Sequence, residues 1–277
     1  MRVEPMQAEL TIAPEPGVAK PDPVLTIDGL RRAFGGLRAV DVDHLEIQRN
    51  TITSIIGPNG AGKTTLFNLL TGFDAPDEGQ WSLDGQGLVG VPAHRVAQRG
   101  MVRTFQLTKV LPRLTVLENM LVAAKAQPGA TFRGALFGGW QSAERRNEAQ
   151  AREILERFGL TAMADEYAGR LSGGQRKLLE MARALMMMPS VVMLDEPTAG
   201  VNPVLIQSLM EHVKGLRESG MTVLFVEHDM DVVQSISDWV VVVAEGRIIA
   251  EGPPGVIARN PAVIEAYLGK RRGEDEE

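Results

Sequence analysis

The hydrophobic and polar positions along the first part of the chain predict strands followed by a helix. Residues 24–30 (VLTIDGL) and 44–50 (HLEIQRN) alternate between apolar and polar residues, as half-buried strands do. Residues 51–57 (TITSIIG) read as a buried, β-branched strand, and residues 62–72 (GKTTLFNLLTG) follow as a helix that ends near a glycine. The order of strand, glycine loop and helix is the start of an α/β unit.

The pattern changes to helical spacing in the middle of the chain. Residues 113–127 and 141–160 have helical periodicity, and the piece between them, residues 128–140, is rich in glycine. We therefore expect a helical insertion at about residues 93–185, with a loop of uncertain order inside it.

The α/β character returns after the insertion. Residues 190–197 (SVVMLDEP) and 221–229 (MTVLFVEHD) read as buried strands, and the helix expected over 203–220 joins them in a parallel crossover unit. Residues 238–252 are expected to form a hairpin that turns at Glu245-Gly246, and a last helix is expected over 253–269.

Length, composition and charge narrow the class of protein. The chain has 277 residues, a net charge of −6 and no cysteine, so disulfides and thiolate metal sites are excluded and nothing favours a nucleic-acid partner. The apolar runs are strand-sized, far below the roughly 20 residues that a spanning helix needs. We expect residues 1–22 to be a disordered N-terminal tail, residues 23–269 to form one domain, and residues 270–277 to be a charged C-terminal tail.

Residues 57–64 (GPNGAGKT) fit the pattern G-x-x-x-x-G-K-[ST], with the required strand before and helix after. In this motif the glycines allow the backbone to wrap phosphate oxygens, Lys63 neutralises the β- and γ-phosphates, and the Thr64 hydroxyl ligates Mg²⁺. Thr65 lies within reach of the α-phosphate. The alternative is a glycine-rich turn with a surface lysine. The predicted nucleotide contacts are Gly57, Asn59, Gly60, Gly62, Lys63, Thr64 and Thr65.

Residues 191–197 (VVMLDEP) supply an acidic pair at the carboxyl end of a buried strand, which is where ligands of α/β proteins bind. Asp195 is predicted to orient Mg²⁺ or its water shell, and Glu196 is a candidate general base for the attacking water. The alternative is that the pair only caps the following loop or helix.

Residues 171–175 (LSGGQ) form a second glycine-rich stretch. Ser172 and Gln175 have the spacing of a capping box, which predicts a helix start, and such a start favours an anion. One chain therefore carries two predicted phosphate cradles.

These motifs together resemble the ATP-binding subunits of ABC transporters, over about residues 24–269. The resemblance implies a P-loop ATPase core of the α/β class with a parallel central sheet, an N-terminal antiparallel β part and a helical insertion subdomain. It also explains the two phosphate sites, because the ATPase subunits of this family form dimers. Each ATP lies between the phosphate-binding loop (the P-loop, here residues 57–64) of one subunit and the signature sequence (here residues 171–175) of the other. The signature residues would be Ser172, Gly173, Gly174 and Gln175.

Further site residues come from the resemblance alone. Gln106 is similar to the glutamine that contacts Mg²⁺ before the insertion, and His228 is similar to the switch histidine near the γ-phosphate. Phe34 falls where the family places an aromatic ring that stacks on adenine, although a core phenylalanine is an alternative. Asn202 departs from the family, because most members carry an acidic residue there.

The same resemblance indicates which type of ABC transporter the chain serves and which partner proteins it has. Segments such as RTFQLTKVLPRLTVLENMLVAA and NPAVIEAYLG look like the ATPases of branched-chain amino-acid import. Urea or amide importers and a lipopolysaccharide-type exporter share many of these segments, and a soluble ABC ATPase without a membrane partner is a further alternative. The expected cofactors are ATP and Mg²⁺. The expected partners are transmembrane permease subunits, a second identical or paralogous ATPase subunit, and indirectly an external substrate-binding protein, with the chain peripheral at the cytoplasmic face of the membrane.

Overall fold

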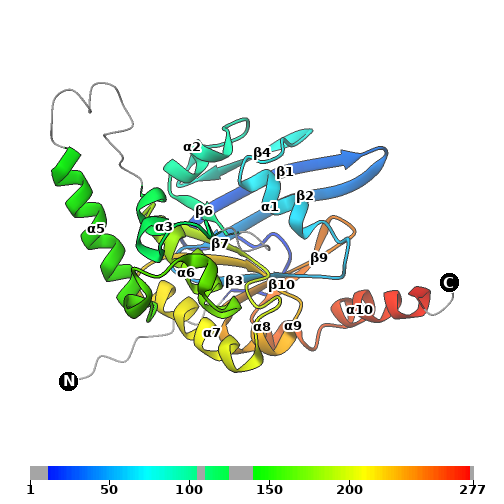
Figure 1. Ribbon diagram of the computed structural model, residues 1–277. Helices are drawn as coiled ribbons and strands as arrows, with labels where there is room; N and C mark the ends of the chain where they lie inside the picture. Colours follow the sequence, from blue (N-terminus) through cyan, green and yellow to red (C-terminus); the bar gives the residue numbers. More distant parts are fainter. Residues whose placement is uncertain (1–11, 105–109, 125–139, 275–277) are drawn as a thin grey trace, which may run out of the picture. The chain divides into compact units, whose positions relative to one another are not determined.

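The structure is a computed structural model that describes residues 12–104, 110–124 and 140–274 (Figure 1). The chain divides into two compact units. Unit 1 comprises Met1–Gly90 and Leu224–Glu277, and unit 2 comprises Val91–Val223. The first unit carries the N-terminal strands and the P-loop, and the second carries the acidic pair and the signature, so each is described by itself.

Unit 1 begins with an antiparallel sheet, which the sequence predicted only in part. Its strands are β1 (Pro23–Phe34), β2 (Leu37–Gln48), β4 (Glu78–Leu83) and β5 (Gln86–Gly87), in the order β2-β1-β4-β5. The long β1–β2 hairpin is the blue pair of arrows in Figure 1. Alternate side chains of these strands are fully buried and form the core of the sheet: Leu25, Ile27, Leu45, Ile47 and Trp81.

Unit 1 contributes the strands β10-β9-β3-β8, in this order, to the second sheet, and the P-loop follows the carboxyl end of the inner strand β3. It contains β3 (Ile52–Ile56), β8 (Thr222–Val226, which spans the division of the chain), β9 (Trp239–Ala244) and β10 (Arg247–Gly252). β3 pairs in parallel with β9, as expected for a central α/β sheet. The predicted hairpin turn is confirmed, because Ala244 pairs with Arg247 across Glu245 (φ 50°) and Gly246 (φ 80°).

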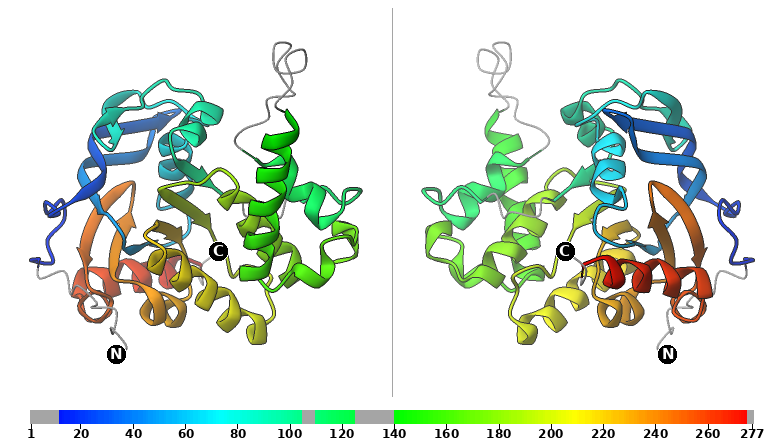
Figure 2. Two further views of the ribbon diagram at one scale, coloured as in Figure 1. Left: turned by 90° about the vertical axis from the view of Figure 1, so that its left-hand side faces the viewer. Right: turned by 90° about the vertical axis from the view of Figure 1, so that its right-hand side faces the viewer.

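The helices of unit 1 are α1 (Lys63–Leu70), α8 (Met230–Ile236), α9 (Pro254–Ile257) and α10 (Pro261–Glu274). The sequence predicted a single helix over 253–269, but α9 and α10 are separate. Pro261 occupies the first position of α10, and Asn260 Oδ1 accepts the N–H of Ala262 at 2.9 Å, which starts a new helix there. α10 also continues through residues 270–274, where we expected a charged tail; Figure 2 shows it in red.

Unit 2 contains the predicted helices and the strand predicted at residues 190–197, together with a short strand at residues 101–103 that the sequence analysis did not expect. Its strands β6 (Met101–Arg103) and β7 (Val191–Asp195) pair in parallel. α3, α5 and α6 pack on one another. The unit extends beyond the insertion expected at 93–185. Its helices are α2 (Ala93–Gln98), α3 (Val116–Val122), α5 (Trp140–Arg157), α6 (Gly173–Leu185) and α7 (Pro203–Glu218), with short turns η2 (Thr161–Met163) and η3 (Ala168–Arg170).

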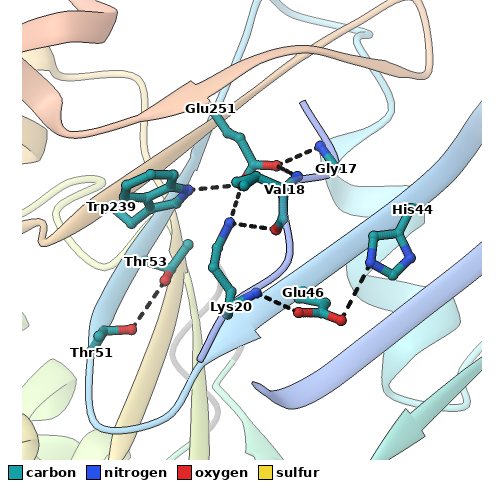
Figure 3. Close-up of polar contacts among 9 residues, drawn as sticks. All are labelled: Gly17, Val18, Lys20, His44, Glu46, Thr51, Thr53, Trp239 and Glu251. Atoms are coloured by element: carbon teal, nitrogen blue, oxygen red, sulfur yellow. Dashed lines mark hydrogen bonds and ion pairs between the residues drawn. The ribbon is translucent and has the colours of Figure 1, made fainter. Parts of the chain in front are cut away.

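Part of the expected N-terminal tail is held against unit 1 (Figure 3). The backbone N–H groups of Gly17 and Val18 donate to Glu251 Oε1 at 2.6 and 3.1 Å. Lys20 Nζ and Trp239 Nε1 both donate to Glu251 Oε2 at 2.8 Å, and the carboxylate is fully buried. We call residues 12–20 the N-terminal strap. It differs from the expectation of disorder over 1–22, because a buried carboxylate requires these donors.

Among the helices of the described residues, none combines the length and the apolar character that crossing a bilayer requires.

Candidate functional site

The P-loop of unit 1 is a tight turn between β3 and α1 that glycine residues make possible. Gly62 is the N-cap of α1 and has a φ of 102°, in the left-handed region that favours glycine. A Cβ atom at Gly62 would lie 2.1 Å from the carbonyl oxygen of Ala39, and one at Gly57 would lie 2.0 Å from that of Val243. The loop therefore lies directly against β2 and β9, and a side chain at either glycine is excluded.

Backbone hydrogen bonds fix the loop to the β9–β10 turn. The N–H of Gly246 donates to the carbonyl of Ala61 at 2.9 Å, and the N–H of Asp41 in β2 donates to the carbonyl of Gly246 at 2.8 Å. The loop is thus preformed by two neighbouring strands rather than by its own sequence alone.

The start of α1 has the character of an anion site. Gly62 provides no side-chain cap, and the N–H groups of the first helical residues have no acceptor within the helix. Lys63 is buried, and its Nζ donates to the carbonyls of Gly57 and Pro58 at 2.6 and 3.0 Å, which curls it over the loop. Thr64 is exposed at this helix start and Thr65 is half-buried, while Asn59 and Gly60 are exposed on the loop.

Two residues predicted from the resemblance lie in the same unit. Phe34 ends β1 and is 48% exposed, so its ring is not the core phenylalanine that was the alternative. It pairs with Leu37, and Ala39, two residues further along β2, is the residue that touches Gly62. His228 is exposed just after β8, the neighbour of β3, and the preceding N–H of Glu227 donates to Ile55 at 3.4 Å. Both residues thus belong to strand ends whose neighbours in the sheets adjoin the P-loop.

In unit 2, Asp195 lies at the carboxyl end of β7 and is paired with an arginine that the sequence analysis missed. Arg103 Nη2 donates to Asp195 Oδ2 at 2.5 Å, and the two side chains are only 5% and 6% exposed. Arg103 ends β6, whose parallel register with β7 brings it beside the acidic end of that strand. Its position three residues before Gln106 was the only sequence signal; Gln106 itself lies outside the described residues.

Glu196, the next residue, has a strained backbone. Its φ is 45°, a left-handed conformation that is uncommon for residues other than glycine. Such conformations cost of order 1–3 kcal/mol and concentrate at functional sites. The strain, on a half-buried carboxylate that follows a fully buried strand, supports the prediction that Glu196 has a role beyond capping.

The signature of unit 2 forms the start of α6, and its predicted capping box is confirmed. Ser172 Oγ accepts the N–H of Gln175 at 3.3 Å, and Gln175 Oε1 accepts the N–H of Ser172 at 2.9 Å. The N–H groups of Gly173 and Gly174, at the first two helical positions, have no acceptor within the helix. A Cβ atom at Gly174 would lie 2.3 Å from Leu205 Cδ1, so α6 and α7 pack closely there.

Asn202, the position that departs from the family pattern, is the N-cap of α7. Its Oδ1 accepts the N–H of Val204 at 3.0 Å, and Pro203 occupies the first helical position. Asparagine and aspartate are equally good at this cap, so the departure leaves the local fold intact.

Comparisons with known proteins agree with this geometry. The family model described as ABC transporter matches residues 40–199, and one described as branched-chain amino acid ATP-binding cassette transporter matches residues 247–272. The high-affinity branched-chain amino acid transport ATP-binding protein BraF of Pseudomonas aeruginosa is 45% identical, over 90% of this chain and 98% of its own.

Two solved structures extend the comparison. A crystal structure of the ADP conformation of an ATP-binding cassette of an ABC transporter is 35% identical, with a TM-score of 0.77 over 89% of this chain and 99% of its own. A dimeric structure of a bacterial ABC transporter cassette is 26% identical, with a TM-score of 0.68 over 83% of this chain and 98% of its own. The α/β fold class expected from the sequence is confirmed, and the chain belongs to the ABC transporter family as an ATP-binding subunit.

Proposed function

We propose that this chain binds and hydrolyses ATP to power an ABC importer of branched-chain amino acids. The observation that carries the ATPase part is the preformed P-loop, in which a glycine N-cap, an uncapped helix start and the buried Lys63 combine. Amino-acid cargo is supported by the 45% identity with BraF and by the match of residues 247–272 to the branched-chain family model.

Each predicted site residue has a proposed role toward the nucleotide. The loop residues Gly57 to Thr65 bind the phosphates, with Lys63 as the counter-charge, and the Phe34 ring stacks on the base. Glu196 orients and deprotonates the attacking water, and His228 contacts the γ-phosphate and that water.

We propose Mg²⁺ as the metal that accompanies the nucleotide. Thr64, Gln106 and Asp195 would hold it, since they carry hydroxyl, amide and carboxylate oxygens, the hard ligands that this ion prefers. When bound, it neutralises charge that develops on the phosphates. Arg103 holds Asp195 Oδ2 at 2.5 Å, so it orients this carboxylate in the protein itself.

The signature of this chain is proposed to contact the nucleotide that is bound to a second ATPase subunit. A helix start with uncapped N–H groups at Gly173 and Gly174 favours a phosphate, and the chain already has one such cradle in its P-loop. We propose that the signature binds the γ-phosphate held by the P-loop of an identical or paralogous subunit, so that dimer closure depends on ATP. Closure then moves the permease subunits, which hold this chain at the cytoplasmic face of the membrane. An external substrate-binding protein delivers the amino acid.

Two variants test the ATPase assignment. Lys63→Ala should lose most nucleotide affinity in a calorimetric titration, and unchanged affinity would overturn the role of the P-loop. Glu196→Gln should bind ATP like the original protein and hydrolyse it at least about 100-fold more slowly, as expected for loss of a general base. Normal steady-state hydrolysis by Glu196→Gln would remove Glu196 from the mechanism.

A capture experiment tests the transporter. The protein is isolated from its native membranes and its companions are identified by mass spectrometry. Two permease subunits and an amino-acid-binding protein are expected. A binding protein for urea or amides, or partners from lipid export, would change the assigned substrate and leave the ATPase assignment intact. Ribosomal or chromosomal partners would contradict the transport role.

A further inference from the structure

Arg32 is held rigidly beside the exposed ring of Phe34. Its Nε donates to Asp74 Oδ2 at 3.0 Å, its Nη1 donates to Asp77 Oδ1 at 2.7 Å, and its Nη2 lies 3.0 Å from Asp74 Oδ1. The other oxygen of Asp77 accepts the N–H of Ala33 at 2.7 Å. The guanidinium carbon lies 4.6 Å from the centroid of the Phe34 ring, a distance at which a cation and an aromatic face attract. We call Arg32, Asp74 and Asp77 the Arg32 clamp.

The local backbone directs both side chains. Arg32 and Phe34 are two residues apart in β1, so they project on the same side of the strand. The β1–β2 register shifts between Arg32 and Ala33 because β2 carries the extra residue, Ala39, so the alternation along β1 itself is kept. The hydrogen bond to Asp77 raises the pKa of Arg32, so its positive charge is retained under all ordinary conditions.

The clamp connects the aromatic ring to the P-loop helix. Asp74 and Asp77 lie in the segment that follows α1, the helix that begins at Lys63. Arg32 therefore links the strand that carries the ring to the distal end of the helix that carries the phosphate site. Since the guanidinium covers one face of the ring and Phe34 remains 48% exposed, the ring keeps an accessible surface for a planar ligand.

We propose that Arg32 is a positioning residue for the nucleotide base, because it fixes the Phe34 ring from the side away from the base. This inference rests on the proposed function, in which Phe34 stacks on adenine. A ring that is already held loses less conformational freedom on binding than an exposed ring that can rotate, and preorganisation of this kind raises affinity. The clamp acts on the base alone and leaves the phosphate contacts unchanged.

The chain offers a matched control in Arg49. Arg49 also bridges two aspartates at the surface of unit 1, with Nε 3.0 Å from Asp22 Oδ2 and Nη2 2.7 Å from Asp84 Oδ1. Among the described residues, cation–π contacts are made by Lys20, Arg32 and Arg170, and Arg49 is not one of them. Its loss removes a comparable ion-pair bridge without touching Phe34.

The experiment compares affinities of the full chain for Mg·ATP and for magnesium triphosphate, which lacks the base, by calorimetry. Arg32→Gln should weaken ATP binding about 5-fold, in line with a cation–π contact at an exposed site, and leave triphosphate binding unchanged. Arg49→Gln should change neither. Phe34→Leu should weaken ATP binding, and adding Arg32→Gln to it should have no further effect, because the two act through one ring.

Each failure has a distinct meaning. Equal ATP affinity of Arg32→Gln and the original protein, with Phe34→Leu still weakened, would overturn the inference and keep the base contact. Parallel loss of ATP and triphosphate affinity would show that Arg32 shapes the phosphate site and would also overturn it. If Phe34→Leu binds ATP as tightly as the original protein, then Phe34 does not contact the base, and both that part of the proposed function and this inference are wrong. If Arg32→Gln does not fold, Asp77→Asn loosens the same guanidinium and should weaken ATP selectively, though less.

Discussion

The buried ion pair of the N-terminal strap allows a quantitative prediction. Lys20 and Glu251 form a 2.8 Å pair whose side chains are only 1% and 0% exposed, and Lys20 Nζ also donates to Val18 and lies 4.5 Å from the centre of the Trp239 ring. Replacing Lys20 by Met keeps a long apolar side chain and leaves the Glu251 carboxylate buried without its cation.

The expected loss follows from what remains around Glu251. Removal of one partner of a buried pair costs about 3–5 kcal/mol. Three neutral donors stay in place, from Gly17, Val18 and Trp239, so the loss should lie at the lower end, about 3 kcal/mol in the free energy of unfolding. The double variant Lys20→Met/Glu251→Gln removes both charges and should recover about 2 kcal/mol of this loss, since no buried charge is left unpaired.

The assay is urea unfolding at pH 8, followed by circular dichroism. Lys214→Met is the control, because Lys214 and Glu211 form a 3.0 Å pair that is 33% and 69% exposed. Exposed pairs contribute about 0–1 kcal/mol, so the control should lie close to the original protein. If Lys20→Met loses no more than Lys214→Met, or if the double variant is less stable than Lys20→Met, then the strap is not held by charge pairing and the reasoning is wrong.

Three further predictions concern unit 1 and unit 2. Gly62→Ala should abolish ATP binding in a calorimetric titration, because its Cβ would lie 2.1 Å from the Ala39 carbonyl and its φ of 102° disfavours alanine; wild-type affinity would contradict the described loop. Asn202→Ala should lose about 1 kcal/mol in urea unfolding through the lost N-cap, whereas Asn202→Asp should lose nothing, and equal losses would exclude the cap as the cause. Burial, with a smaller effect of Arg157, lowers the pKa of His212 below its ordinary value of 6.5, where its ring stacks on Phe158 at 4.8 Å. The unfolded state therefore binds a proton more readily, so stability should fall as the pH drops from about 7 to 5.5, and His212→Phe should reduce this dependence.

The sequence alone determined those features that depend on neighbouring residues. The capping box of Ser172 and Gln175 and the hairpin turn at Glu245-Gly246 lie within a few residues, so their spacing specifies the backbone directly. The P-loop motif predicts the turn between β3 and α1, which β2 and β9 then hold in place. Short elements such as β6, with three residues, and β5, with two, escaped prediction because they are too short to show a period.

The tertiary structure decided the contacts between residues far apart in the chain. Lys20 and Glu251 are separated by 231 positions, and Arg103 and Asp195 by 92. Neither pair has a spacing that can be read along the chain, because its members meet only in the folded structure. A lysine in a polar N-terminal segment predicts a solvated side chain. Only the burial of Glu251 beside Trp239 makes that lysine necessary, since a carboxylate removed from water must find a cation and hydrogen-bond donors within the fold.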